Sequence, residues 1–297
     1  MKLDIIIPIA TPEALFIHNI IPYIIKNIDV GGGKIFLITN RKNFEILNKL
    51  CHKYSICKII DEDKLIKGLS YNSVKKTFVK KYGKEIRTGW YLQQFIKMAF
   101  SISDFCKTEY YMSWDADTIP LREIAFFDDD HPIFDMKTEY HKPYFDTINE
   151  LFGFGKISDS SFISEHMIFN SVIMRELINN ISKSKVSGDS WVDKIINATN
   201  FEKAKRSEMF SEFETYGTFC MYHYPDLYRM RHLNTLRGGG FICGRFINNE
   251  LLRSLSWDLD TISFELSSCP PFPMSIFHRM YRYWVKYKIW VINKKYK

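Results

Sequence analysis

The chain has 297 residues, enough for one large domain or two small ones. Hydrophobic residues make up 46% and charged residues 25%, which excludes a disordered or collagen-like chain. The net charge is +7, but seven of the 41 basic residues lie between Ser275 and Lys297, a segment without acids, and the rest of the chain has 34 bases against 34 acids. A neutral body with a short basic end argues against a nucleic-acid-binding surface.

The first half of the chain alternates between apolar runs and amphipathic stretches. Short β-branched runs predict buried strands at residues 3–9, 34–39, 56–60 and 106–114. Helical periodicity lies between them, at residues 13–28, 43–54 and 90–101. Strands that alternate with helices predict an α/β fold with a mostly parallel sheet flanked by helices.

The second half is less regular and shows no linker. We expect helices at residues 167–182 and 190–199, and a short strand at 241–243 after a glycine-rich loop. The proline cluster at 270–273 marks the end of the globular body. Asp4 and Pro8 interrupt the first apolar run, and no stretch approaches ~20 apolar residues, so we expect neither a signal peptide nor a membrane span.

Asp115 and Asp117 stand one residue apart, directly after a predicted strand. Two such carboxylates can share one divalent cation, which prefers oxygen ligands and leaves positions open for phosphate. The same residues can also form a strand-ending turn in which they accept hydrogen bonds from backbone amides. The carboxyl ends of strands are where open α/β sheets bind their ligands.

Five segments, in this order, give the chain a family resemblance: residues 4–8, 89–97, 114–118, 164–167 and 211–217. With them the chain resembles the bacterial glycosyltransferases of GT-A architecture that build capsular and lipopolysaccharide sugars. The resemblance implies a Rossmann-like GT-A domain at residues 1–270, with a nucleotide-sugar-binding half at 1–120 and an acceptor-binding half at 121–270. It also implies transfer of a sugar from a nucleotide-sugar donor to a growing surface-polysaccharide or glycolipid acceptor.

The resemblance also implies site residues. Asp117 would hold Mn²⁺ or Mg²⁺, with Asp115 beside it near the ribose or a metal-bound water. Four residues would lie near the nucleoside: Pro8, Thr11, Thr39 and Asp61.

Three further residues flank or lie on the predicted helix before the acids, namely Arg87, Gln94 and Lys97. A cation or an amide there could meet the diphosphate or the base, although a solvated helix face explains them equally well. His166 lies in a segment that lines the acceptor side in the family. A structural role for this histidine is a simpler explanation than a catalytic one. His223 and His232 are candidates for a third metal ligand.

An inverting enzyme needs a carboxylate that takes the proton of the acceptor hydroxyl, whereas a retaining one does not need it at the same place. Glu212 and Glu214 follow Ser211, a good N-cap, and Glu214 stands where it would complete a capping box. Glu212 is therefore the better candidate for the base, ahead of Glu214, and we expect inversion.

Two other functions fit part of the pattern. A sugar nucleotidyltransferase also uses paired acids on a β/α nucleotide fold, but it usually begins with a glycine-rich phosphate loop, which residues 9–12 lack. A non-enzymatic, membrane-docked interaction protein would use the acids only to shape a turn.

The basic end predicts an amphipathic helix. At roughly 100° per residue, cations fall on one side, at Arg279, Arg282 and Lys286, and an apolar stripe on the other. The stripe comprises Phe277, Met280, Tyr281, Trp284, Tyr287, Val291 and Ile292. We expect residues 271–297 to bind an anionic membrane, with the enzyme in the cytoplasm on the inner face of the cytoplasmic membrane. A helix packed on the body, or bound to a partner protein, would show the same pattern.

Overall fold

A computed structural model describes residues 1–201 and 208–296, and its centre is a five-stranded sheet in the order β3-β2-β1-β4-β8. The strands are β1 (Leu3–Ile9), β2 (Ile35–Thr39), β3 (Cys57–Asp61), β4 (Tyr110–Trp114) and β8 (His166–Asn170). The first four pair in parallel, and β8 runs antiparallel to β4. The predicted α/β fold with a mostly parallel sheet is therefore confirmed.

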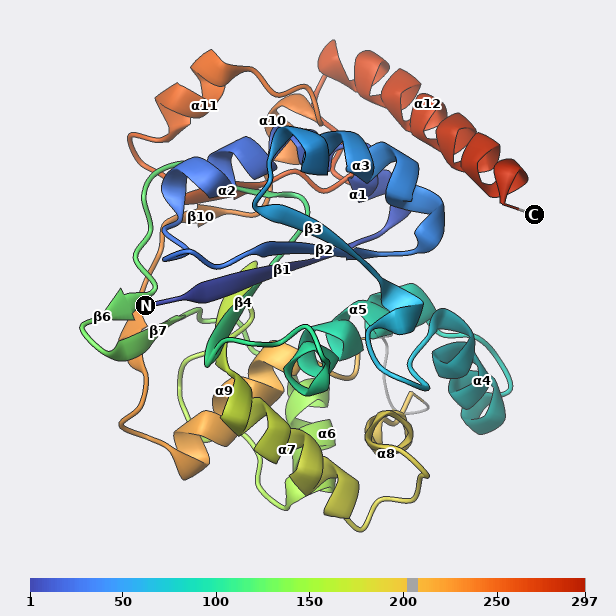
Figure 1. Ribbon diagram of the computed structural model, residues 1–297, viewed down its shortest axis with the longest axis vertical. Helices are drawn as coiled ribbons and strands as arrows, with labels where there is room; N and C mark the ends of the chain where they lie inside the picture. Colours follow the sequence, from blue (N-terminus) through green and yellow to red (C-terminus); the bar gives the residue numbers. More distant parts are fainter. Residues whose placement is uncertain (202–207, 297) are drawn as a thin grey trace.

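Helices cover both faces of this sheet, which explains why every residue of β1 is buried. Figure 1 shows α2 (Ile21–Asn27) and α3 (Phe44–Lys53) on one face. On the other face lie α5 (Thr88–Ala99), α7 (Ser171–Lys183) and α9 (Glu212–His223). The beginnings of α5 and α9 and the ends of the parallel strands thus meet at one edge of the sheet.

Smaller elements complete the body. Three further helices, α4 (Tyr71–Tyr82), α6 (Lys142–Phe152) and α8 (Trp191–Ala198), pack beside α5 and α9. One small sheet contains β10 (Thr235–Leu236), β11 (Thr261–Ser263) and β5 (Thr118–Pro120), and another contains β6 (Phe127–Asp128), β7 (His131–Asp135) and β9 (Arg229–Arg231). Short helices are α1 (Thr11–Ala14), α10 (Gly240–Cys243) and α11 (Asn249–Leu255), with 3-10 turns η1 (Ile17–Asn19), η2 (Arg41–Asn43), η3 (Glu62–Lys64) and η4 (Phe100–Ile102).

The structure corrects three sequence predictions. The helix expected at 13–28 is divided into α1, η1 and α2, because Pro22 fits the first turn of α2 but cannot continue a helix that started earlier. Residues 167–170, expected to begin a helix, belong to the strand β8, and α7 starts only where Asn170 caps the amides of Val172 and Ile173. Residues 241–243 belong to the helical turn α10 and form no strand.

The basic end of the chain forms one long helix, α12 (Met274–Lys295), as predicted. It lies against α1 and η2 and runs along the outside of the body (Figure 1). His278 and Val285 are its buried residues, and Lys297 lies outside the described part of the chain. Among the residues described, no helix combines the length and the hydrophobicity needed to cross a bilayer.

Gly217 lets α9 approach a neighbouring loop, and we predict that Gly217→Ala destabilises the protein. A Cβ at this position would lie 2.3 Å from ring atoms of Phe162, which is fully buried and cannot swing away. Overpacking costs about 1–3 kcal/mol, which outweighs a gain of about 1 kcal/mol in helix propensity. Urea unfolding should therefore show a loss of roughly 1–2 kcal/mol.

The matched control is Gly155→Ala, because a Cβ there meets no heavy atom within 4 Å. Equal free energies of unfolding for the two variants would contradict this account of the α9 packing.

Candidate active site

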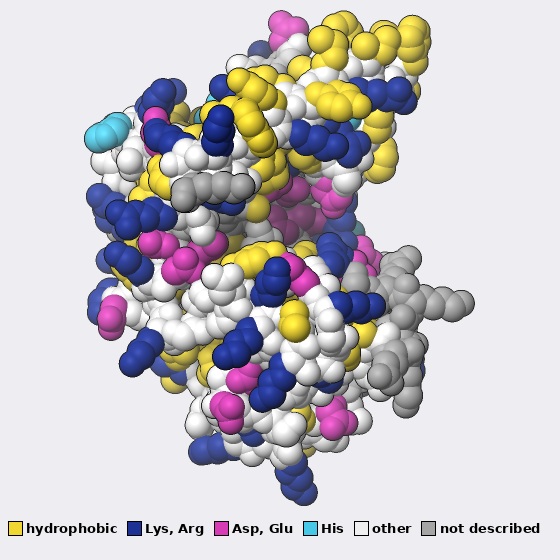
Figure 2. All heavy atoms as spheres, turned by 90° about the vertical axis from the view of Figure 1, so that its right-hand side faces the viewer, with side chains coloured by type: hydrophobic (Ala, Val, Ile, Leu, Met, Phe, Trp, Pro, Cys, Tyr) yellow, Lys and Arg dark blue, Asp and Glu magenta, His cyan; other side chains and the backbone are white. Residues whose placement is uncertain are grey.

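Two cavities adjoin at the carboxyl edge of the sheet. The first, of about 540 Å³, is lined by residues after β1 and β4 and at the beginning of α9, and we call it the acid cavity. The second, of about 380 Å³, is lined by residues at the ends of β1, β2 and β3, and we call it the strand-end cavity. Pro8, Ala10, Gly89 and Gln93 line both, so the two form one cleft. Figure 2 shows a hollow between the two halves of the molecule, with acidic side chains inside it.

Asp115 and Asp117 both line the acid cavity. Their backbone is held between two sheets, because the Asp115 amide donates to the Glu165 carbonyl and the Phe264 amide donates to the Asp117 carbonyl, both at 2.9 Å. Burial, together with the negative charges of Asp115 and Glu13, raises the pKa of Asp117 to about 7, although the Arg245 guanidinium acts in the opposite direction. The pair therefore sits in an excess of negative charge.

Lys97, on α5, lies under this pair and is almost fully buried. Its Nζ is 3.0 Å from Asp115 Oδ1 and 2.8 Å from Glu212 Oε1. Burial alone lowers the pKa of Lys97, but the charges and hydrogen bonds of the two carboxylates outweigh burial and raise the pKa above its ordinary value. Lys97 is therefore a cation that joins the end of β4 to the start of α9.

The two candidate bases have separate environments. Ser211 caps α9, as predicted, and its Oγ accepts a hydrogen bond from the Glu214 amide at 3.2 Å. The predicted capping box is wrong, because the Glu214 carboxylate turns into the core and accepts from Ser161 Oγ and from the Phe162 amide. Glu214 is not among the residues that line the cleft, whereas Glu212 lines the acid cavity beside Lys97.

Gln94 and Arg87 also differ in position, because Gln94 lines the cleft and Arg87 does not. Gln94 lines the acid cavity, and its Oε1 accepts from the Glu212 amide at 3.2 Å. Its Nε2 has no hydrogen-bond partner within the described residues, which leaves a donor at the cavity wall. Arg87 forms an ion pair with Glu208 and lies over the ring of Trp90, 4.9 Å from its centroid, and it lines neither cavity.

The four residues expected near the nucleoside stand at the ends of strands, but only two face the strand-end cavity. Pro8 and Thr11 line it. Thr39 is buried and ties β1 to β2, since its Oγ1 donates to the Ile9 carbonyl at 2.6 Å. Asp61 accepts from the Asp63 amide at 3.2 Å and so caps η3, whose residues line the cavity in its place.

The candidate histidines lie away from the two acids. His166 is buried in β8, stacked on Trp114 with ring centroids 4.9 Å apart, and burial lowers its pKa well below the ordinary value. His223 and His232 are not among the residues lining the acid cavity. Within residues 1–201 and 208–296, no three His, Cys, Asp or Glu side chains are placed to hold a metal ion together.

A divalent cation nevertheless fits the charge of this site. Within the described residues Asp117 has one weak side-chain hydrogen bond, to Thr118 Oγ1 at 3.5 Å, and its pKa is raised first by burial and then by the negative charges of Asp115 and Glu13. Mg²⁺ and similar ions often use one or two protein carboxylates and take their remaining ligands from substrate phosphates and water. Asp117 and Asp115 can supply the one or two protein carboxylates that such an ion needs.

Sequence reasoning missed the residues that support the acids from the side. Arg245 is fully buried, with its Nη2 3.1 Å from Glu13 Oε1 and its Nε donating to the Phe264 carbonyl at 2.9 Å. Arg237 forms ion pairs with Glu165 and Glu139. The two arginines stand at the two ends of the glycine-rich segment, and that segment was the signal that could have drawn attention to them. Their ion-pair partners are far away along the chain.

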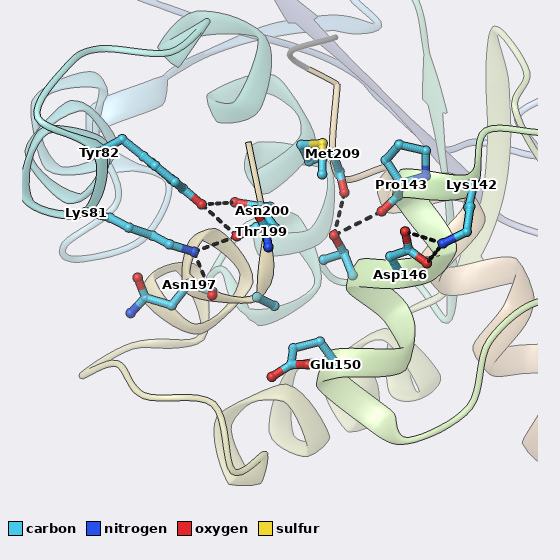
Figure 3. Close-up of a pocket in the computed structure, with 12 residues that line it drawn as sticks. Lys81, Tyr82, Lys142, Pro143, Asp146, Glu150, Asn197, Thr199, Asn200 and Met209 are labelled. Atoms are coloured by element: carbon cyan, nitrogen blue, oxygen red, sulfur yellow. Dashed lines mark hydrogen bonds and ion pairs between the residues drawn. The ribbon is translucent and has the colours of Figure 1, made fainter. Parts of the chain in front are cut away.

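A larger cavity, of about 820 Å³, lies elsewhere, between α4, α6 and α8 (Figure 3). Several of its polar groups bond to the protein itself. Lys81 Nζ donates to the carbonyls of Ile196, Asn197 and Thr199, and Thr147 Oγ1 donates to the Met209 carbonyl. None of the predicted site residues lines it, so the smaller cleft is the better candidate.

Residues 3–236 match the model of a family described as "Family of unknown function (DUF6492)". No curated protein matches the chain. Three solved structures are similar to it: mouse xyloside xylosyltransferase 1 in its apo form, the galactosyltransferase LgtC in complex with donor and acceptor sugar analogs, and the mannosyltransferase Ktr4p from S. cerevisiae.

For the xylosyltransferase the TM-score is 0.45 and the identity 11%, over 92% of this chain and 99% of that one. The values are 0.41 and 10% for LgtC, over 88% and 86%, and 0.43 and 11% for Ktr4p, over 67% and 66%.

Glu214 gives a prediction on pH. Burial raises its pKa above 4.5, so the folded protein holds this proton more tightly than the unfolded chain does. The stability that Glu214 contributes is present below pH 4.5 and is lost as the pH rises through its raised folded-state pKa. In urea unfolding, we expect the stability of Glu214→Gln, relative to wild type, to improve as the pH rises from 4 through the raised pKa of Glu214 and then to level off.

The control is Glu123→Gln, which alters an exposed carboxylate and should leave the pH profile of stability unchanged. Parallel profiles for wild type and Glu214→Gln would show that Glu214 is not under this burial penalty.

Proposed function

The chain belongs to the DUF6492 family, and we propose that it is a metal-dependent glycosyltransferase that moves a sugar from a nucleotide-sugar donor to a surface-polysaccharide or glycolipid acceptor. One observation carries the proposal: Asp115, Asp117, Lys97 and Glu212 converge in a cleft that continues into a second cavity at the strand ends. The capsule and lipopolysaccharide pathways remain the predicted setting.

The two cavities suit the two ends of a nucleotide-sugar. The strand-end cavity has an apolar floor at Pro8, Ile9 and Leu92 and carboxylates at Glu62 and Asp63, which suits a flat base and the hydroxyls of a ribose. The acid cavity would then hold the diphosphate and the sugar. Phosphates need a positive charge in so acidic a site, and a cation at Asp117 and Asp115 would supply it together with Lys97.

The chemical step that we propose is a single displacement. The acceptor hydroxyl oxygen forms a bond to the anomeric carbon, and the bond from that carbon to the diphosphate oxygen breaks. The hydroxyl proton passes to the Glu212 carboxylate, and the nucleoside diphosphate leaves with the electron pair. Gln94 orients Glu212 by accepting a hydrogen bond from its backbone amide, and Lys97 orients it by forming an ion pair with its Oε1. Attack opposite to the leaving group inverts the anomeric configuration.

The first test is a thermal-shift panel of UDP-, GDP-, CMP- and dTDP-sugars, each with and without Mn²⁺. A ligand at 100 times its dissociation constant adds about 2.7 kcal/mol to stability, which is readily visible. Stabilisation by one nucleotide class, larger with Mn²⁺, is the expected result. No stabilisation by any of them would refute the proposal and favour a non-enzymatic protein.

We also propose that the enzyme works in the cytoplasm, on the inner face of the cytoplasmic membrane. The support for this location is α12, whose side chains combine aromatic residues with cations and include no acid. An acceptor that is assembled on a lipid would be met at such a surface.

We predict that Asp117→Asn lowers turnover by about 10²-fold or more while the fold survives, because the amide keeps the shape but loses the charge that balances the cation. Asp115→Asn should be nearly as severe. Turnover is measured as release of nucleoside diphosphate, with Asp128→Asn, an exposed acid outside the cleft, as the control. Near-native turnover of both variants in the presence of a chelator would rule out the metal site.

We predict that Glu212→Gln damages the chemical step more than donor binding, since an amide fills the same volume but cannot accept the proton. Turnover should fall by about 10²–10⁴-fold, while the thermal shift given by the donor stays close to that of wild type. NMR of the product decides the role: a retained anomeric configuration would remove the need for a base at this position.

A further inference from the structure

The structure shows which face of α12 is free. Its buried and half-buried residues, among them His278, Tyr281, Val285 and Ile292, recur at helical spacing and contact the body. Eight exposed apolar residues fall within an arc of roughly 140° on the opposite side. We call them the outer face: Ile276, Phe277, Met280, Tyr283, Trp284, Tyr287, Trp290 and Val291.

The exposure of the outer face is large for residues of this type. Tyr283 is 72% exposed and Trp290 is 57% exposed, and Phe272, just before the helix, is 79% exposed. Contiguous exposed apolar patches of this kind mark interaction sites in soluble proteins. Figure 2 shows the hydrophobic side chains gathered over this helix, above the hollow that contains the acids.

Cations border the outer face on both sides. Lys286 Nζ lies 5.7 Å from the ring centroid of Tyr283 on one edge, and Lys288 Nζ lies 5.6 Å from that of Trp284 on the other. Arg279 and Arg282 are exposed on the first edge. The 22 residues of α12 include no acid that would repel an anion.

We infer that the outer face of α12 binds the surface of an anionic phospholipid bilayer. Tyrosine and tryptophan rings favour the headgroup region, where an apolar ring and a polar tip are both satisfied, and lysines beside them reach lipid phosphates. Cations on both edges and the absence of acids from the helix favour a continuous anionic surface over a protein partner, whose surface would carry both signs of charge.

Docking on this face would bring the cleft to the membrane. The helix α12 packs on α1 and η2, and Thr11 and Lys42 of these elements line the strand-end cavity. Lys42 Nζ also donates to Asn293 Oδ1 at 3.1 Å, so a direct hydrogen bond joins the helix to the cleft wall. An acceptor carried by a membrane lipid is then the substrate class that this arrangement serves best.

The experiment measures co-sedimentation of the whole protein with phosphatidylglycerol-containing vesicles and with phosphatidylcholine vesicles at ~0.15 M salt. We expect binding to the anionic vesicles only. The double substitution Tyr287→Ala and Trp290→Ala should weaken it by about tenfold or more, and Arg279, Arg282 and Lys286 changed to Gln should each weaken it by about fivefold.

Matched controls change the same residue types elsewhere on the surface. Trp257→Ala removes a ring that is 81% exposed outside α12, and Gln at Lys107, Lys183 and Lys185 removes three exposed charges. These variants should bind vesicles like wild type.

Equal binding by wild type and the α12 variants, or equal binding to both kinds of vesicle, would overturn the inference. So would light scattering that shows a dimer which the Tyr287 and Trp290 substitutions dissociate, because a second copy would then cover the face. Vesicle binding is measured without donor or acceptor, so this inference can fail while the glycosyl transfer stands, and the reverse is also true.

Discussion

A buried cation between two acids is the constraint on which the site depends. Taking an ammonium group out of water costs several kcal/mol, and the cost is recovered only if close partners are fixed in place. Lys97 has two such partners, Asp115 from the end of β4 and Glu212 from the start of α9. Three elements that are distant in the sequence therefore have to meet at one point, and the cleft opens at that point.

The same ion pairs explain how the two acids of the motif differ. Asp115 is held by Lys97, while Asp117 forms no ion pair within the part of the chain that the structure describes, and its pKa rises with burial. Two neighbouring carboxylates thus have different environments, one oriented and one under electrostatic strain. Differences of this kind are typical of sites that bind or transfer charged groups.

Much of the fold was predictable, because each short apolar run between amphipathic stretches marks a buried strand. The run at residues 167–169 was misread because a short buried strand and the start of a buried helix have the same pattern. Asp115, Asp117 and Glu212, which line the acid cavity, were predicted from local spacing and resemblance. The capping function of Asp61 and the Thr39 bond to Ile9 are local contacts that turn those side chains away from the cavity, and spacing carries no information on side-chain direction.

The partners in the ion pairs were not predictable from one sequence. Glu13 and Arg245 are 232 residues apart, and no local pattern connects them. The face by which α12 packs on the body was not predictable either. Periodicity shows that the helix has two faces, but the body decides which one it covers, so Tyr281 and Ile292 turn inward while Tyr283 and Trp290 turn outward.

The segment from Arg237 to Arg245 has a consequence for ligand binding in the cleft. Arg237 holds Glu165, next to the wall residues Ile163 and Ser164, and Arg245 holds Glu13 on another part of the wall. One short peptide thus fastens two parts of the acid cavity through ion pairs. The entropic cost of shaping these two parts of the wall is therefore met when the protein folds and not each time a ligand binds.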